Sequence, residues 1–74
     1  MNISLFPNPA TEDLQINGFE GTAFITISDI NCVVSIKKQI INGEYISLRL
    51  LRKGMYIAKI ITSNYMIEKK LVKI

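Results

Sequence analysis

The fold is decided by Ala23-Phe24-Ile25-Thr26-Ile27-Ser28, in which small or branched apolar residues alternate with polar or aromatic ones. Apolar residues at every second position place their side chains on one face of an extended chain, which predicts a half-buried β-strand. Asp29-Ile30-Asn31-Cys32 follows and predicts a hairpin connection, because Asp and Asn side chains bond their own backbone and Asn tolerates the left-handed region. The whole stretch therefore predicts a strand that turns back antiparallel.

The same period of two continues through nearly the whole chain of 74 residues. Further strands are predicted at residues 3–6, 14–17, 33–40, 45–50, 55–61 and 65–74. Asn42-Gly43 predicts a two-residue type I′ hairpin between two of them, since both residue types accept a positive φ, and Gly54 and Ser63-Asn64 predict further turns. Six or seven strands, with turns about every 8 to 12 residues, predict an all-β fold, a small antiparallel, Ig-like β-sandwich.

The composition is typical of one small globular domain. Hydrophobic residues make up 49% of the chain and charged residues 20%, which is an ordinary globular balance. No apolar run approaches the roughly 20 residues that a membrane span needs, so no membrane insertion is expected. Met1 precedes a polar Asn2 and no apolar segment follows at once, so no Sec signal peptide is visible in this chain.

The ionisable residues favour binding over catalysis. The six carboxylates are scattered over predicted turns and strand ends, there is no His, and Cys32 is the only cysteine. No catalytic pair, internal disulfide, metal site or cofactor is therefore expected. Nine Lys and Arg residues give a net charge of +3, which leaves a solvated strand face and a nucleic-acid-binding barrel as alternatives. The aromatic residues are scattered rather than grouped, so no nucleic-acid partner is expected.

Three further segments, far apart in the chain, together resemble one protein family. Leu5-Phe6-Pro7-Asn8-Pro9 opens the chain, Leu51-Arg52-Lys53-Gly54-Met55-Tyr56 lies near its last third, and Lys69-Lys70-Leu71-Val72-Lys73-Ile74 closes it. In this order they resemble the C-terminal sorting domain (type A) of proteins exported by the type IX secretion system of Gram-negative bacteria. Cys32 departs from the pattern, because glycine is usual there, and its β-carbon predicts a turn that is longer than type I′ or of another type.

The resemblance implies a non-catalytic secretion signal that directs a cargo protein across the outer membrane. Its partners would be the outer-membrane type IX translocation machinery and, in many members, a sortase-like peptidase that removes the domain by cutting before Ile3. The cargo would cross the periplasm and be secreted or held at the cell surface, and residues 1–74 would be one domain of a larger secreted protein. The alternative is a stand-alone β-sandwich module that binds carbohydrate or protein.

The candidate sorting-signal residues are Pro7, Asn8, Pro9, Gly54, Tyr56, Lys70, Lys73 and Ile74. The prolines either end the first strand or touch the exporter, and the lysines either are recognised or block unwanted pairing at an edge. Gly54 is expected to take a positive φ, and Tyr56 to be a core or corner aromatic with a partnered hydroxyl. We expect the last strand to expose an edge that pairs with another chain. Deletion of residues 71–74 is expected to abolish export from a domain that still folds.

Overall fold

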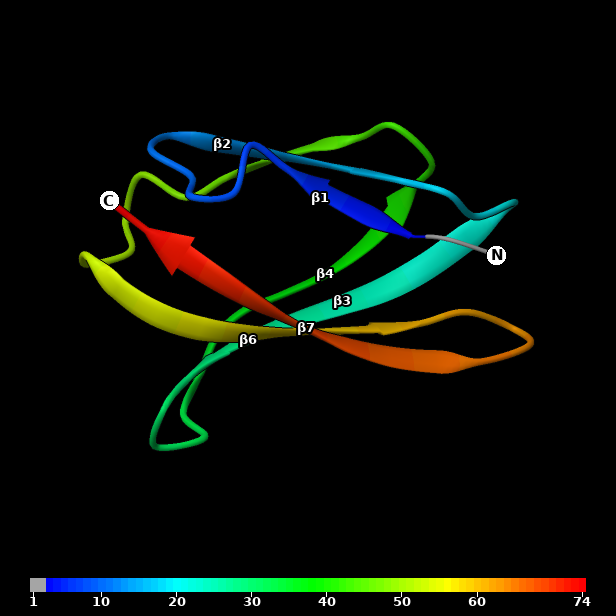
Figure 1. The fold of residues 1–74 in the computed structure, drawn as a ribbon. Helices are drawn as coiled ribbons and strands as arrows, with labels where there is room; N and C mark the ends of the chain where they lie inside the picture. The colour runs from blue at the N-terminus through cyan, green and yellow to red at the C-terminus, as the bar shows by residue number, and fades with distance from the viewer. Residues whose placement is uncertain (1–2) are drawn as a thin grey trace.

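The computed structural model describes residues 3–74 as two packed antiparallel sheets (Figure 1). The strands are β1 (Ser4–Phe6), β2 (Asp13–Asn17), β3 (Thr22–Asp29), β4 (Val34–Ile41), β5 (Tyr45–Ser47), β6 (Gly54–Ile61) and β7 (Met66–Lys73). One sheet has three strands in the order β1-β2-β5, and the other has four in the order β4-β3-β6-β7. The predicted all-β sandwich is confirmed, and none of the described residues lies in a helix.

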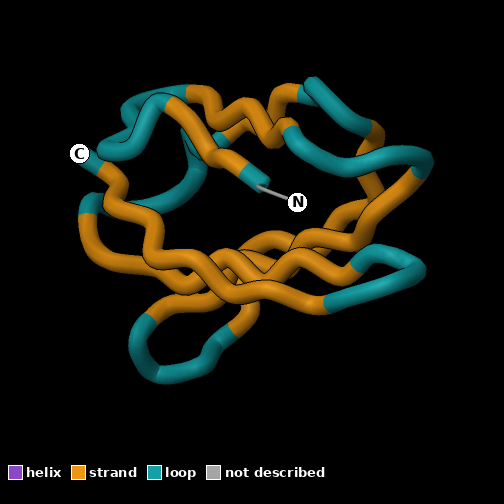
Figure 2. The backbone as a smooth tube through the Cα atoms, turned by 45° about the vertical axis from the view of Figure 1, so that its right-hand side comes forward, coloured by secondary structure: helices purple, strands orange, loops and turns teal. Residues whose placement is uncertain are grey.

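Each sheet buries one apolar face against the other, and the two layers are visible in Figure 2. In the four-stranded sheet, Ile25 and Ile27 of β3 are fully buried, whereas Phe24 beside them is 52% exposed. In the three-stranded sheet, Leu14 and Ile16 of β2 are fully buried. Each such side chain stabilises the fold by about 1.5–3 kcal/mol relative to exposure. The period of two in the sequence is therefore the alternation between core and solvent.

The turn between β3 and β4 projects from the body of the sandwich (Figures 1 and 2). The Cys32 amide donates to the Asp29 carbonyl at 3.0 Å, and the Asp29 amide donates to the Val33 carbonyl at 3.0 Å. The Asp29 carboxylate accepts from the amides of Asn31 and Val33. With a φ of 65° at Cys32, this is a three-residue loop in which a left-handed residue follows a type I turn. The predicted departure from a type I′ turn is confirmed.

Replacing Cys32 by glycine is expected to stabilise the domain by roughly 0.5–1 kcal/mol. The left-handed conformation costs a residue with a β-carbon about 1–2 kcal/mol, and the larger backbone entropy of unfolded glycine offsets part of that gain. The matched control is Cys32→Ala, which removes the thiol but keeps the β-carbon. Urea unfolding of both variants measures the difference, and equal midpoints for the two would show that the backbone at Cys32 is unstrained.

The predicted hairpin at Asn42-Gly43 is wrong, because β4 and β5 belong to different sheets. A β-turn does form there, since the Glu44 amide donates to the Ile41 carbonyl at 3.1 Å, but only Gly43 takes a positive φ, of 84°. The Asn42 side-chain oxygen accepts instead from the amides of Gly18 and Phe19. The turn residues therefore carry the chain from one sheet to the other rather than closing a hairpin.

The strand predicted at residues 45–50 begins at Tyr45 as expected but ends early, at Ser47. Leu48 is fully buried and its carbonyl accepts from the Leu51 amide at 3.0 Å, which closes a turn. Leu50 lies in this turn with 99% of its surface exposed, so the expectation that Leu50 continues the alternating strand is also wrong. The strand β5 is therefore only three residues long, and a turn rather than a strand follows it.

Candidate recognition site

The first and last motif segments, which are more than 60 residues apart, lie side by side. The Asn8 side-chain amide donates to the Lys70 carbonyl at 2.9 Å, and its oxygen accepts from the Val72 amide at 3.1 Å. Pro7 and Pro9 on either side have no amide hydrogen, and both follow cis peptide bonds. The Asn8 side chain thus supplies to β7 the donor and the acceptor that a neighbouring strand would supply from its backbone.

Ala10 extends this contact to the end of the chain. Its amide donates to the Val72 carbonyl at 2.8 Å, and its carbonyl accepts from the Ile74 amide at 2.8 Å. Ala10 is fully buried and forms a parallel bridge with Lys73. The expected open edge is therefore wrong between Lys70 and Ile74, because residues before β2 already occupy the hydrogen-bonding groups on that side of β7.

The middle motif segment joins the same corner through the β6–β7 ladder. Gly54 pairs with Lys73, and Tyr56 pairs with Leu71. Gly54 has a φ of 152°, as expected for a glycine at this turn. Tyr56 is 7% exposed, and its hydroxyl donates to the Arg52 carbonyl at 2.7 Å. A tyrosine at the start of a strand that bonds back to the backbone four residues earlier is the tyrosine corner of β-sandwiches, so the expected partnered aromatic is confirmed.

Replacing Tyr56 by phenylalanine is expected to lower the free energy of unfolding by about 1–2 kcal/mol. The ring keeps its packing, but the Arg52 carbonyl loses the hydroxyl that donates to it, and this hydrogen bond no longer holds the loop before β6. The control is Tyr45→Phe, since Tyr45 is 61% exposed on β5. Urea unfolding should separate the two variants, and an equal loss of stability in both would refute the corner's contribution.

The charged candidates are not brought together. Lys70 pairs with Ile57 and lies on the outer face of the four-stranded sheet, where it is exposed. Lys73 lies three residues further along β7 and therefore has the opposite orientation, on the side of Tyr56 and Leu71, where it is half-buried. Ile74 follows with 54% of its surface exposed. A partner that contacts both lysines must reach around the end of β7.

We call this region the signature corner and define it as residues 7–10, 54–56 and 70–74. All eight candidate residues from the sequence lie in this corner, while Ala10 was missed. The signal that could have found Ala10 is its place directly after a Pro-Asn-Pro run, where a small apolar residue can enter the core. The corner presents exposed prolines, an exposed lysine and an apolar chain end, which suits binding of another protein.

The described residues, 3–74, contain no group of three or more His, Cys, Asp or Glu side chains that could hold a metal ion. Among them, no helix has the length and apolar character needed to cross a membrane. The tyrosine corner and the two antiparallel sheets define a small β-sandwich.

The comparison with protein families assigns this chain to one of them. The secretion system C-terminal sorting domain matches residues 4–74, which is nearly the whole chain. The protein therefore belongs to this family, the C-terminal sorting domains of type IX secretion, whose members are in general non-catalytic signal domains. Cargo that carries such a domain is secreted or attached to the cell surface by way of the outer membrane. No curated protein matches this chain.

Proposed function

We propose that the outer-membrane type IX translocation machinery recognises this domain in its folded form, at the signature corner. The observation that carries the proposal is the contact of Asn8 with β7. Because β7 also pairs with the middle motif segment on β6, the three distant segments meet at one corner of the domain. A signal read from a folded domain needs such an arrangement, whereas a signal read from an unfolded tail does not. Pro7, Pro9 and Lys70 are exposed at this corner and are available to a partner.

The charge at the corner indicates the chemistry of the contact. Lys70 has no ion pair among the described residues, and Lys73 reaches only the carbonyl of Ile74, at 3.5 Å. An acidic surface on the machinery is the complementary partner, and charged contacts of this kind give specificity and speed of association more than affinity.

We propose further that a sortase-like peptidase removes the domain by cutting before Ile3, after the cargo has passed through the periplasm. Residues 1–74 would then be the sorting domain of a larger secreted protein whose Sec signal lies elsewhere. A reporter fused ahead of the domain tests this step. The surface-delivered reporter should lack the 8.4 kDa of the domain on an immunoblot, and should keep it in a strain without the peptidase. Full-length reporter at the surface of both strains would refute removal.

Recognition at the corner is tested by Lys70→Glu in the same fusion. The variant should deliver less reporter to the surface, because it reverses the charge that faces the machinery. The matched control is Lys59→Glu, which changes a lysine on the outer face of the same sheet, on β6. Equal surface delivery of both variants and of the unchanged domain, with equal melting temperatures, would contradict recognition through Lys70.

A further inference from the structure

The outer edge of β4 is open over its middle residues. In an antiparallel ladder, the amide and carbonyl of every second residue point away from the neighbouring strand. At Ile41 both groups do so, since the amide donates to the Glu44 carboxylate and the carbonyl accepts from the Glu44 amide. The same alternation turns the backbone groups of Lys37 and Gln39 outward. Within residues 3–74, neither residue has a hydrogen-bond partner on that side.

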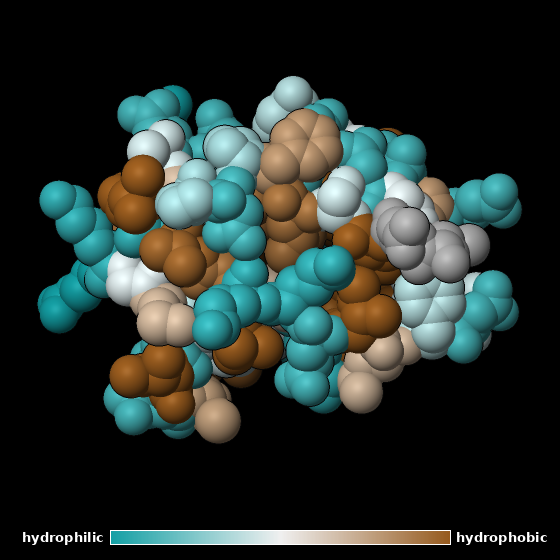
Figure 3. Space-filling view, in the orientation of Figure 1, coloured by the Kyte–Doolittle hydropathy of each residue, from teal (hydrophilic) through white to brown (hydrophobic). Residues whose placement is uncertain are grey.

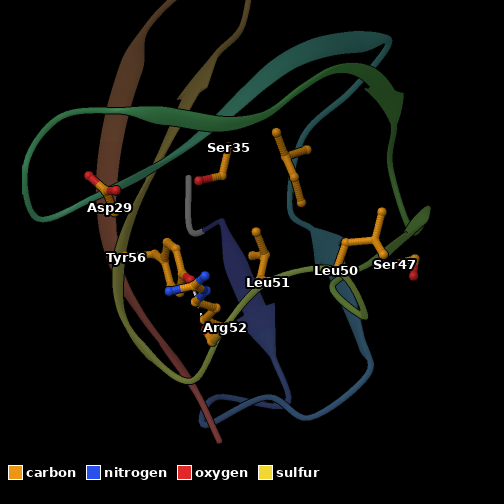
Figure 4. A pocket seen from close by; sticks show the side chains of 8 residues that line it. Asp29, Ser35, Ser47, Leu50, Leu51, Arg52 and Tyr56 are labelled. Carbon is orange, nitrogen blue, oxygen red and sulfur yellow. Dashed lines mark hydrogen bonds between the residues drawn. The ribbon is translucent and has the colours of Figure 1, made fainter.

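A groove lies beside this open edge. It has a volume of about 540 Å³ and is lined by Asp29, Ser35, Ile36, Ser47, Leu50, Leu51, Arg52 and Tyr56. Ser35 of β4 faces Leu51 and Arg52 of the β5–β6 connection across it (Figure 4). The groove exists because β5 ends at Ser47, so the inner face of β4 is covered near Ile40 but only partly at Ile36.

The groove carries apolar side chains together with one cation, Arg52, one anion, Asp29, and two serines. Leu50 is 99% exposed, and Leu51 and Ile36 are each half-buried. Hydrophobic and hydrophilic residues are intermixed over the face of the molecule drawn in Figure 3. Lys38 is bound to Glu44 at 2.9 Å, and this hydrogen bond lowers the pKa of the Glu44 carboxyl. Lys37, on the outer face opposite Thr26, has no ion pair within the described part of the chain.

We propose that the β4 edge binds an extended, acidic segment of another protein as an added strand. The backbone groups of Lys37 and Gln39 supply the hydrogen bonds, as in other cases of strand addition. A carboxylate opposite Lys37 shares the outer face with it, and the residues before and after that carboxylate point inward. One of them lies opposite Ile36 and enters the groove when it is apolar. The other lies opposite Lys38, whose ammonium group is already bound to Glu44. The partner is therefore a segment with the alternation apolar, acidic, apolar.

The charge of β4 argues against a second copy of this chain as the occupant. Antiparallel pairing of two β4 strands about their centres would place Lys37 and Lys38 of each copy next to those of the other. Like charges opposite one another destabilise a strand pair, and lysines on an edge are a common protection against self-pairing. An acidic segment has the complementary charge. This edge lies across the sheet from β7 and the signature corner, so binding there can be tested separately from export.

The test is a titration of the full chain with a seven-residue peptide, acetyl-Thr-Thr-Ile-Glu-Ile-Thr-Thr-amide, followed by NMR. Saturable binding should slow hydrogen exchange at the amides of Lys37 and Gln39. A peptide methylated on the amide nitrogens that face β4 should fail to bind, because it cannot donate to the strand. Absence of saturable binding, or protection along β7 instead of β4, would overturn the proposal.

Charge reversal gives the second arm of the test. Lys37→Glu should weaken binding of the glutamate peptide by about fivefold, the upper range for a cross-strand ion pair. The variant should bind a peptide with lysine in place of the glutamate more tightly than it binds the glutamate peptide. Lys59→Glu, in the same row of the sheet on β6, should leave both affinities unchanged. Equal effects of the two variants, or self-association of the free protein through β4, would also overturn it.

Discussion

Leu71→Ala is expected to lower the free energy of unfolding by about 2–5 kcal/mol, the range measured for truncation of buried leucines. Leu71 is fully buried, it pairs with Tyr56 on β6, and its neighbours in β7 hold Asn8 and Ala10. A domain of this length has a total stability of roughly 4–11 kcal/mol. The substitution should therefore unfold a measurable part of the population, which urea unfolding followed by circular dichroism detects.

Val72→Ala is the control for this substitution. Val72 lies next to Leu71 on the opposite face of β7 and is only half-buried, and its backbone contacts do not depend on the side chain. A loss of less than about 1 kcal/mol is expected there. If both variants lost the same stability, β7 would not be part of the core. The burial of Leu71 also revises the expectation that a chain without residues 71–74 still folds, because that deletion removes a core side chain and the ladder partners of Gly54–Tyr56.

Asn8→Ala is expected to lower the free energy of unfolding by about 1–3 kcal/mol. The substitution removes two hydrogen bonds at once and leaves the Lys70 carbonyl and the Val72 amide without partners at the edge of the sheet. Local opening should be larger than global unfolding, so hydrogen exchange at the Val72 amide is the sensitive measurement. That amide should exchange faster in the variant, while amides in the centre of β3 follow only the global change.

Two further variants serve as an intermediate case and as a control for Asn8→Ala. Asn8→Asp keeps an acceptor for the Val72 amide but removes the donor to Lys70, so its effect should lie between those of the unchanged chain and Asn8→Ala. Asn64→Ala changes an exposed asparagine in the β6–β7 turn, and a change within about 0.5 kcal/mol is expected. Unchanged exchange at Val72 in Asn8→Ala would mean that the first and last motif segments are not coupled.

The sequence predicted the strands well where one local signal decides them. Ile25 and Ile27 are buried because they alternate with polar or exposed residues, and the Asp29–Cys32 turn follows from side chains that bond their own backbone. At Asn42-Gly43 the predicted turn does form. The prediction of a hairpin was wrong because these two residues do not determine which sheet the next strand joins. That choice depends on Asn42 bonding Gly18 and Phe19, a long-range contact.

The candidate residues were chosen from the sequence, but the way they are arranged in space was not predicted. No local pattern indicated that the Asn8 side chain replaces backbone groups on β7, since the two segments are separated by more than 60 residues. The opposite orientation of Lys70 and Lys73 followed from their odd spacing and could have been read from it. The prediction that Leu50 lies in a strand was wrong because the alternation of the sequence continues past Ser47, where the strand ends. Leu48 is buried in a turn that leads the chain away from the sheet.

The most direct test of the central claim is the location of a reporter that carries its own Sec signal and residues 1–74 at its C-terminus. The fusion is expressed in a host with a type IX system and in the same host without its outer-membrane translocon. We expect the reporter at the cell surface, open to added protease, in the first host and in the periplasm of the second. A reporter that stays in the periplasm of both hosts would contradict the assignment of this domain as a sorting signal.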